Sequence, residues 1–406
     1  MNILFDFITL HQYTGAGEYV RRVFYEVLKQ KEKLELNIFG LFDSKKGIAY
    51  SDIKNISNIT LVDINKDNIN TIIKKYNINR FFIGCAQYIG KYEGIDKISC
   101  EVICTTHDLC DEEFYSNKIS TYLRLSSLDA ELPIKQTLKD RIRTFFFPNM
   151  HLDNFSKWYI SFGGNKIYKS HQNRMPPIIQ LFHNNPKMEF IVVSEYTKSS
   201  MIYNYNIPSE KIRVLYSPER ISYSEDSLCC DVLKKIILEG KKYFLFVSAN
   251  RKVKNIDKTI NAFRKYAEIH PESYLVTIGY NGSKQFNNHI ILSFLSDNDL
   301  ELAYKHCYAL LYPSFFEGFG YPPLEAMRYG KPVLCSNTTS LPEIFGDAPI
   351  YFSPLYESAI FQALTKLCKN NYEYFSNKSL LQYQIIHDRQ GKDLDSLIKF
   401  LVRENI

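Results

Sequence analysis

The 406-residue chain lacks an apolar run long enough to cross a membrane, because a spanning helix needs about 20 consecutive apolar residues. It also lacks a strong charge of either sign, and a formal net charge of +6 does not by itself indicate a nucleic-acid partner. No basic segment with a cleavage site precedes residues 2–8, which are predicted to start directly as a strand. These absences predict a cytoplasmic protein, either soluble or peripheral at the inner face of the cytoplasmic membrane, that binds no nucleic acid.

A disulfide framework is missing as well. The nine cysteines are odd in number and scattered along the chain, which favours a reducing compartment. Cys104, His107 and Cys110 lie close in sequence, but no second Cys/His pair completes a four-ligand metal site. The acidic run 111–113 does not have the Asp-x-Asp pattern of a metal motif. The sequence therefore predicts neither a metal nor another cofactor.

The chain does contain an alternation of apolar strands and amphipathic helices. Predicted strands in the first half are 2–8, 36–42, 81–84, 101–106, 190–194 and 211–216, with a helix at 17–29 after the first of them. Predicted strands in the second half are 242–248, 273–279, 289–294 and 308–312. This alternation predicts an α/β protein with parallel βαβ packing, in which ligands collect beyond the carboxyl ends of the strands.

The stretch 314–330 carries the most specific pattern. A glycine-bearing loop follows a buried strand, and then comes a predicted helix with a proline pair in its first turn and Gly330 just past its end. The amides of such a loop and of the helix N-terminus together favour an anion. Glu317 in the loop and Glu325, placed in the first helical turn, flank this position.

The two glutamates indicate what the anion belongs to. A carboxylate can accept two hydrogen bonds from the vicinal hydroxyls of a sugar. The predicted ligand is therefore a nucleoside diphosphate with a sugar at both ends. The alternative is that Glu325 only complements the dipole of its own helix.

The glutamates have the spacing Glu-x7-Glu, and the segment EGFGYPPLEAMRYGKPV at 317–333 closely resembles the signature of retaining GT-B glycosyltransferases of family 4, the glycosyl transferases group 1. The resemblance implies a GT-B fold, with two Rossmann-like parallel-sheet domains facing an interdomain cleft. It also implies that Glu317 and the loop amides hold the donor sugar and diphosphate, that Glu325 holds the ribose, and that no metal is needed. The donor-binding residues implied in this loop are Gly318, Phe319, Gly320 and Tyr321.

Gly15 and Gly17 follow the first predicted strand. A nicotinamide-dinucleotide site with Asp43 as the ribose ligand fails on details, because the glycines do not follow the strand immediately and Val20 occupies the third glycine position. The pair resembles instead the N-terminal glycine loop of the family, where the backbone approaches donor phosphate or acceptor. The equally weighted alternative is a strand-to-helix turn that needs glycine for positive φ.

His107 is predicted to end a strand, at the edge where ligands bind. His107-Asp-Leu resembles the same tripeptide in family members, whose histidine faces the donor sugar. The alternative is a satisfied structural histidine, which is the commoner role for a lone histidine at a strand end.

Basic residues follow the predicted strand 242–248. Asn255, after them, is a plausible N-cap of the next predicted helix. Cations in this loop can stabilise a diphosphate as it leaves. Family members carry an arginine and a lysine here. Lys254 matches the lysine, but Ala249 occupies the usual arginine position and leaves Arg251 as its substitute. The alternative is a solvated basic loop.

Two further segments have less specific patterns. Residues 295–300 resemble the segment in which family members receive the nucleobase on backbone groups, which makes Leu295 and Ser296 candidates, while Asp297 or Asn298 is predicted to cap a helix.

The range 131–174 is rich in basic and aromatic residues. It is predicted either to contact an anionic membrane surface or to be an acceptor-side subdomain with an ordinary core.

The predicted domains are 1–220 on the acceptor side with the insertion 131–174, 221–385 on the donor side, and a helix at 386–406 crossing back to the first domain. A linker is predicted at 217–231.

The predicted function is metal-independent, retaining transfer of a sugar from a nucleotide donor to a glycan or polyprenyl-linked glycan in cell-surface polysaccharide assembly. His107, Glu317, Lys254 and Arg251 are the predicted catalytic residues. The loop sequence is most similar to mannosyl- and rhamnosyltransferases, so GDP-mannose is the first expectation and UDP- or dTDP-sugars are alternatives. Other functions considered are a GT-B sugar epimerase or phosphorylase, and a non-catalytic carbohydrate-binding protein of the same fold.

Overall fold

The computed structural model describes residues 1–115, 175–220 and 230–403. The chain divides into two compact units, one made of 1–109 with 174–406 and the other of 110–173. A short helical turn, Asp111–Tyr115, belongs to the second unit. The predicted insertion 131–174 and most of the predicted linker lie outside the described residues, so the predictions made for them are not taken further.

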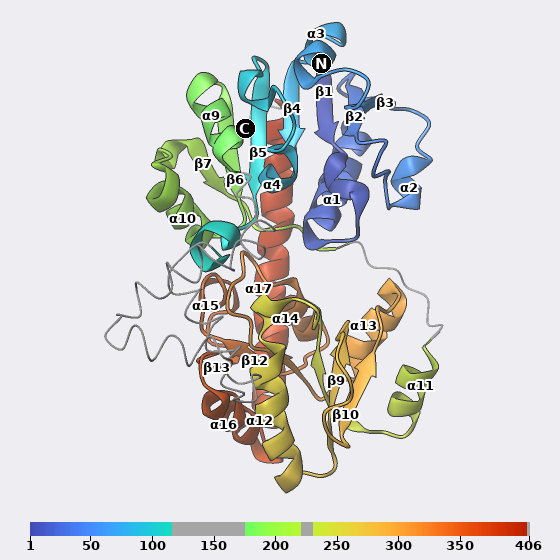
Figure 1. Ribbon diagram of the computed structural model, residues 1–406, viewed down its shortest axis with the longest axis vertical. Helices are drawn as coiled ribbons and strands as arrows, with labels where there is room; N and C mark the ends of the chain where they lie inside the picture. Colours follow the sequence, from blue (N-terminus) through green and yellow to red (C-terminus); the bar gives the residue numbers. More distant parts are fainter. Residues whose placement is uncertain (116–174, 221–229, 404–406) are drawn as a thin grey trace, which may run out of the picture. The chain divides into compact units, whose positions relative to one another are not determined.

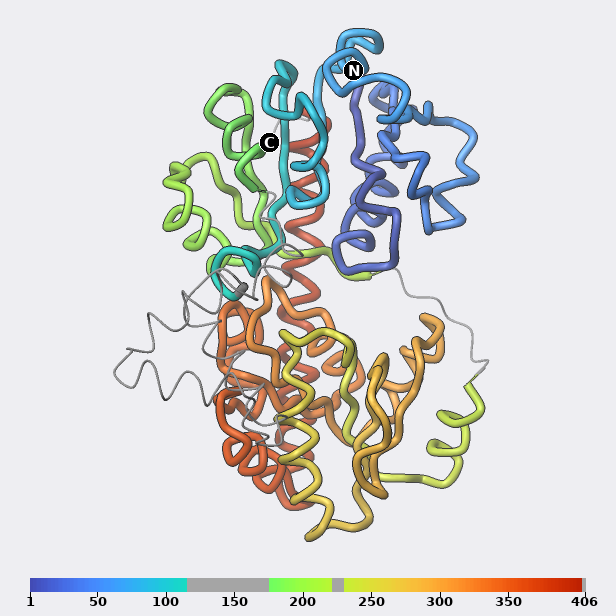
Figure 2. Tube along the Cα trace, viewed as in Figure 1, coloured from blue at the N-terminus to red at the C-terminus, as the bar shows by residue number. Residues whose placement is uncertain are grey.

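Two separate parallel sheets form the first unit (Figure 1). The first sheet has the order β3-β2-β1-β4-β5-β6-β7, and every pair of neighbours is parallel. Its strands are β1 (Asn2–Asp6), β2 (Asn37–Phe42), β3 (Thr60–Asp63), β4 (Arg80–Ile83), β5 (Glu101–Thr106), β6 (Met188–Val192) and β7 (Ile212–Val214). In Figure 2 the green segments that form β6 and β7 run beside the cyan segment that forms β5, so strands from before residue 116 and from after residue 174 belong to one sheet.

Helices cover both faces of this sheet. They are α1 (Gly15–Gln30), α2 (Ser51–Lys54), α3 (Ile69–Lys75), α4 (Ala86–Ile89), α9 (Pro176–Asn184) and α10 (Glu195–Tyr205), with 3-10 turns at Ile8–His11, Ile95–Lys97 and Ser209–Lys211. Thr14 caps α1 by accepting a hydrogen bond from Gly17 N. Tyr19, Val23 and Val27 recur at helical spacing on its buried face.

The second sheet has the order β10-β9-β8-β11-β12-β13, again with parallel neighbours throughout. Its strands are β8 (Lys242–Phe246), β9 (Ser273–Ile278), β10 (His289–Leu292), β11 (Ala309–Tyr312), β12 (Val333–Ser336) and β13 (Ile350–Phe352). The remaining helices are α11 (Asp231–Leu238), α12 (Ile256–Ile269), α13 (Asp297–His306), α14 (Tyr321–Arg328), α15 (Leu341–Phe345), α16 (Glu357–Lys366) and α17 (Lys369–Val402), with a 3-10 turn at Lys252–Lys254.

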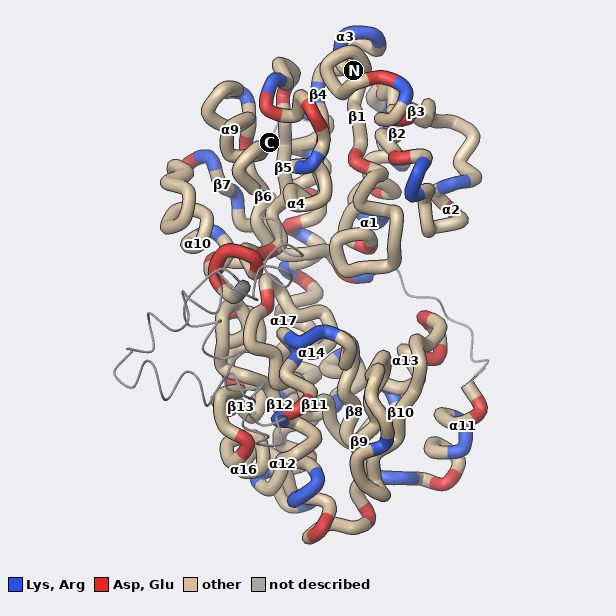
Figure 3. The backbone as a smooth tube through the Cα atoms, in the orientation of Figure 1, with Lys and Arg blue, Asp and Glu red and all other residues tan. Residues whose placement is uncertain are grey.

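Each sheet has a point where the strand order reverses. In the first sheet β1 lies between β2 and β4, and in the second β8 lies between β9 and β11. Open parallel sheets bind ligands beyond the carboxyl ends of the strands at such points. The loops after β8 and β11 contain the predicted site residues Arg251, Lys254 and 317–320, and Figure 3 shows that charged residues gather on loops and helices while the strands are largely uncharged.

Helix α17 spans 34 residues and contributes to apolar clusters on both sheets, including Phe375 in a third cluster beside the second sheet. Ile386 packs in a cluster with residues of the second sheet, whereas Leu397 and Leu401 pack with Ile3 and Phe5 of β1. The helix therefore begins well before residue 386 and runs on without interruption, while the predicted domain limits stay predictions. Among the described residues, no helix is both long and apolar enough to cross a bilayer.

Candidate active site

The loop 313–320 connects β11 to α14 and is held from two sides. On one side Phe315 N donates to Val253 O at 2.8 Å, in the turn after β8. On the other, Glu317 N donates to Thr339 Oγ1 at 3.0 Å, in the loop after β12. These bonds fix the loop at the carboxyl edge of the second sheet, beside the neighbouring strand ends.

Lys254 and Glu317 form a buried ion pair in this loop cluster. Nζ of Lys254 lies 2.5 Å from Glu317 Oε1 and donates a second hydrogen bond to Tyr312 Oη at 2.7 Å. Burial by itself would raise the pKa of Glu317, but the nearby Lys254 ammonium outweighs burial, and the pKa is lowered. Glu317 is therefore a carboxylate at neutral pH, with a cation beside it.

Two glycines allow the loop to come close to other backbone segments. A Cβ at Gly318 would lie 1.9 Å from the carbonyl oxygen of His107, so any larger residue would push the loop away from the end of β5. Gly320 has φ +102°, and a Cβ there would stand 2.8 Å from Leu341 Cδ2. Between them Phe319 is buried, with its ring edge-on to Tyr321 at 5.6 Å between centroids.

Helix α14 begins at this loop. Gly320 occupies its N-cap position, and no side chain forms a capping hydrogen bond there. Pro322 and Pro323 have no N–H, so among the first three helical residues only Tyr321 has an amide to offer a ligand. Gly330, with φ +63°, follows the helix end, as predicted. Glu325 is the fifth helical residue and not part of the first turn. The predicted position of Glu325 was therefore wrong by part of a turn, and its interaction with the helix dipole is correspondingly weaker.

Arg220 is the partner of Glu325. Its Nη1 lies 2.8 Å from Glu325 Oε1, and its guanidinium covers the ring of Tyr321 at 5.4 Å. Glu325 Oε2 and Arg220 Nε are both buried without a hydrogen bond of standard geometry to any described residue, although Tyr304 lies beside the carboxylate. The pair thus retains an unused acceptor and an unused donor. Sequence reasoning missed Arg220 because a single arginine at the edge of a polar linker gives no signal.

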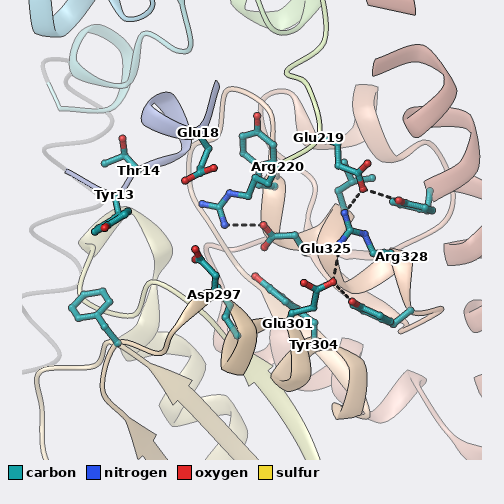
Figure 4. Close-up of a pocket in the computed structure, with 16 residues that line it drawn as sticks. Tyr13, Thr14, Glu18, Glu219, Arg220, Asp297, Glu301, Tyr304, Glu325 and Arg328 are labelled. Atoms are coloured by element: carbon teal, nitrogen blue, oxygen red, sulfur yellow. Dashed lines mark hydrogen bonds and ion pairs between the residues drawn. The ribbon is translucent and has the colours of Figure 1, made fainter. Parts of the chain in front are cut away.

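A cavity of about 230 Å³ opens beside this pair (Figure 4). Its lining comes from the start of α1, residues 219–220, the loop after β10, α13 and α14. Figure 4 shows Glu18 and Asp297 on either side of the Arg220 guanidinium. Burial raises the pKa of the Glu18 carboxyl, and the charges of Arg220 and Arg21 only partly oppose this.

One wall of the cavity is a network of paired charges. Arg328 bonds to Glu219 and, at 3.0 Å, to Glu301, while Tyr383 of α17 donates to Glu219 at 2.8 Å. Glu219 lies next to Arg220, so the network also fixes the backbone that carries Arg220. Among the described residues, no group of three His, Cys, Asp or Glu side chains could hold a metal ion.

His107 directly follows β5, as predicted. Its Nε2 lies 2.9 Å from the carbonyl oxygen of Gly84, which can only accept, so Nε2 carries the proton and Nδ1 is an acceptor. Burial lowers the pKa of His107 to about 4, so the ring is neutral at physiological pH. The edge of the ring meets Tyr19 at 4.9 Å between centroids. His107 can therefore accept a hydrogen bond but cannot supply a positive charge.

Gly15 and Gly17 lie in the first turn of α1 and not in a separate loop. Neither has positive φ, so the alternative that the turn requires glycine for that conformation is wrong. The requirement at Gly17 is space, since a Cβ would lie 2.6 Å from Tyr50 Oη. At Gly15 a Cβ would lie 3.5 Å from the ring of Tyr321, so this helix start approaches the start of α14.

The loop after β8 differs from the prediction in one respect. Asn255 does occupy the N-cap position of α12, but with φ +63° and no capping bond, because its Nδ2 donates to Pro354 O at 2.8 Å. Arg251 is exposed at the start of the 3-10 turn that carries Lys254, whereas Ala249 is buried. The structure therefore brings Lys254 to Glu317 and leaves Arg251 on the surface of the same turn.

The loop after β10 contains the other donor candidates. Ser296 caps α13 by accepting a hydrogen bond from Asp299 N at 3.1 Å, so the prediction that Asp297 or Asn298 is the cap was wrong. Leu295 is partly buried against the core of the second sheet. A capping role occupies the Ser296 hydroxyl and leaves the backbone groups of this loop as the available contacts.

Comparison with known proteins agrees with this architecture. The profile of the family described as glycosyl transferases group 1 matches residues 233–379. O-antigen chain mannosyltransferase B of Escherichia coli is 32% identical over 183 residues, which is 40% of this chain and 47% of that protein. O-antigen chain mannosyltransferase RfbU of Salmonella typhimurium is 30% identical over 177 residues, which is 40% of this chain and 46% of that protein. The chain thus spans less than half the length of these relatives.

Solved structures resemble the chain over nearly its whole length. Sucrose-phosphate synthase of Thermosynechococcus elongatus has a TM-score of 0.64 at 13% identity, covering 99% of both chains. WaaG, a glycosyltransferase of lipopolysaccharide biosynthesis, has a TM-score of 0.58 at 14% identity, covering 97% of this chain and 99% of its own. The chain has the GT-B fold. Its residues 233–379 are similar to the glycosyl transferases group 1 family.

Proposed function

We propose that the protein is a glycosyltransferase that moves a sugar from a nucleoside-diphosphate donor to a hydroxyl of a glycan or lipid-linked glycan during cell-surface polysaccharide assembly. The observation that carries the proposal is the buried Lys254–Glu317 pair next to the uncapped start of α14. Cation, open amide and carboxylate together match the phosphate and sugar of one donor. The O-antigen mannosyltransferase relatives support this activity.

The diphosphate is proposed to lie at the start of α14, near Lys254. Helix amides and a buried ammonium stabilise negative charge, and they are already in position before the reaction begins. Arg251, exposed on the same turn as Lys254, is the second proposed cation. As the bond between the anomeric carbon and the phosphate oxygen breaks, negative charge builds on the diphosphate. These groups would stabilise that charge.

The two sugars of the donor are assigned to the two glutamates. Glu317 and the neutral His107 would orient the transferred sugar, with His107 Nδ1 accepting a hydrogen bond from a sugar hydroxyl. Glu325 would accept hydrogen bonds from the ribose hydroxyls, and its buried Oε2 is an acceptor without a standard partner.

We also propose that the anomeric configuration is retained and that no metal takes part. The acceptor oxygen would attack the anomeric carbon on the face from which the diphosphate leaves. The proton of the acceptor hydroxyl would pass to the departing phosphate oxygen, so that atoms and charge balance without a base from the protein. GDP-mannose is the first proposed donor because the relatives are mannosyltransferases, and UDP- and dTDP-sugars are the alternatives. The proposed acceptor is a glycan on a polyprenyl carrier.

A donor panel tests this proposal. Purified protein is incubated with GDP-, UDP- and dTDP-sugars, and both thermal stabilisation and slow donor hydrolysis are measured. We expect at least one donor to raise the melting temperature and to be hydrolysed. Glu317→Gln should remove hydrolysis, whereas Glu268→Ala, an exposed glutamate on α12, should not change it. Absence of stabilisation by every donor, or full hydrolysis by Glu317→Gln, contradicts the proposal.

A further inference from the structure

Asp6 is a fully buried carboxylate at the end of β1. Its Oδ1 accepts a hydrogen bond from Thr9 N at 3.0 Å, and its Oδ2 accepts from Thr9 Oγ1 at 2.5 Å and from Gly84 N at 3.2 Å. Burial raises the pKa of Asp6 to about 6, and the groups that oppose burial are hydrogen-bond donors of Thr9, Gly84 and Cys85. At neutral pH Asp6 is therefore mainly a carboxylate, held inside the protein by neutral donors.

A structural role accounts for only part of this arrangement. The two bonds to Thr9 hold the 3-10 turn Ile8–His11, which follows β1. An asparagine would accept from Thr9 N equally well, without the free energy that burying a charge costs. A carboxylate differs from an amide in having a second acceptor oxygen, and this oxygen reaches Gly84, 78 residues further along the chain. The contact with Gly84 is thus what requires an acid at this position.

Gly84 follows β4 and links Asp6 to His107. Its carbonyl oxygen lies 2.9 Å from His107 Nε2. This carbonyl belongs to the same peptide group as the N–H of Cys85, one of the donors that lower the pKa of Asp6. A negative charge beside the N–H of a peptide polarises the group and makes its carbonyl oxygen a stronger acceptor. Close packing fixes the position of this peptide, since a Cβ at Gly84 would lie 2.0 Å from Val20 Cγ2 of α1.

We propose that Asp6 is a positioning residue that acts on His107 through the peptide between Gly84 and Cys85. The polarised carbonyl holds the ring proton on Nε2, orients the imidazole and keeps Nδ1 as an acceptor. This inference rests on the proposed function, in which Nδ1 of His107 accepts a hydrogen bond from the transferred sugar. The tautomer of His107 is nevertheless a property of the protein alone, so it can be measured without a substrate.

Nuclear magnetic resonance of isotope-labelled histidine measures this tautomer. The spectrum of His107→Asn identifies the His107 signals among those of the nine histidines. We expect the proton on Nε2 in the wild type and a mixture of both tautomers in Asp6→Asn, because one amide oxygen cannot accept from both Thr9 N and Gly84 N. Thr9→Val is the matched control, since it removes one bond to the same carboxylate, leaves the bond to Gly84 and should keep the wild-type tautomer. An unchanged tautomer in Asp6→Asn overturns the inference.

Donor hydrolysis gives a second readout. We expect Asp6→Asn to lower kcat by at least about tenfold, because small displacements of a positioned group cost rate. The affinity for the nucleoside diphosphate product should stay unchanged, since His107 is assigned to the sugar. The double variant Asp6→Asn with His107→Asn should hydrolyse no more slowly than His107→Asn alone, because groups that act as a unit are not additive. A further loss in the double variant would show that Asp6 acts elsewhere and would overturn the inference.

A pH titration of the wild type needs no variant. The titratable groups of the described residues that interact electrostatically with Asp6 are Cys85, Cys104 and Tyr92, and burial raises the pKa of each, so all three are neutral below pH 7. The pKa of His107 itself is lowered to about 4. We therefore expect the tautomer ratio of His107 to change with a midpoint near pH 6, where Asp6 takes up a proton. A ratio that stays constant between pH 7 and 5 contradicts the inference.

The inference and the proposed function can fail separately. If the wild type hydrolyses no nucleotide sugar, the proposed function fails, while the tautomer of His107 in Asp6→Asn still decides whether Asp6 positions the ring. If the wild type hydrolyses a donor but Asp6→Asn keeps the wild-type tautomer, the inference alone is wrong.

Discussion

His107 shows, at the scale of one residue, how burial limits the chemistry of a side chain. The ring donates to the Gly84 carbonyl and is neutral because its pKa is lowered to about 4. In an unfolded chain the same ring has a pKa near 6.5. Between these two values the unfolded state binds more protons than the folded state, so folding stability falls as pH falls through this window.

This difference predicts a pH-dependent stability. Lowering the pH from 7 to 5 should cost about 2 kcal/mol of unfolding free energy through His107 alone. His107→Asn should show a smaller loss over the same range, measured by urea unfolding at the two pH values. His183→Asn, on the exposed end of α9, serves as the control and should keep the wild-type pH dependence. Equal losses in wild type and His107→Asn would show that the pKa of His107 is the same in the folded and the unfolded protein.

Some site residues could be predicted from the sequence and others could not. Glu317, Lys254 and His107 could be predicted because each belongs to a contiguous pattern after a strand. Arg220 could not, since its partner Glu325 is 105 residues away and the contact exists only in the folded chain. Ser296, Asp297 and Asn298 are equally good caps of α13 by residue type, and only the backbone geometry shows that Ser296 is the cap.

At the scale of elements, the candidate site is built around the connection between β11 and α14. Its strand, loop and helix could be predicted because buried strand, glycines, prolines and Gly330 all point to the same structure. The prolines do lie in the first turn of α14, but Glu325 was placed there as well because prolines are compatible with several first-turn positions. Strand β3 was missed because it has only four residues, and its first two are exposed, so it gives little periodic signal.

The loop predicts a strong effect of one added methyl group. In Gly318→Ala the new Cβ would overlap the His107 carbonyl, so the loop must move and carry Glu317 with it. We expect donor hydrolysis to fall by at least about tenfold, because small displacements of positioning groups cost rate. Gly391→Ala, in α17 with nothing within 4 Å of the new Cβ, is the matched control and should keep full activity. Hydrolysis at the wild-type rate in Gly318→Ala would show that the loop does not position the donor.

For the whole molecule, α17 joins the apolar cores of the two sheets. The alternating pattern predicted two sheets, but it could not show that one helix serves both, because that depends on which distant residues the helix face meets. The final turns bury Leu401 completely among side chains of β1 and α1. The residue pattern alone showed only a polar helix near the end of the chain, and the resemblance to the family implied that this helix crosses back to the first domain.

Leu401 therefore predicts a stability effect far from the site. Leu401→Ala should lower the unfolding free energy by about 2–5 kcal/mol, through lost burial and the cavity left behind. Leu381→Ala, in the same helix but 65% exposed, should change it by less than about 0.5 kcal/mol. Denaturant titration of both variants measures this. Similar small losses in the two would mean that the end of α17 is not docked in solution.

The two ion pairs at the site have a consequence for discrimination among anions. Lys254 is neutralised by Glu317, and Glu325 is neutralised by Arg220, before any substrate is present. A stray inorganic phosphate therefore meets no uncompensated charge from Lys254 or Arg220 and gains little from these two residues by entering. A ligand can compete with these internal ion pairs only if it is long enough to replace several of their contacts at the same time. The empty protein would thus resist occupation by the small anions that surround it in far greater number than its substrate.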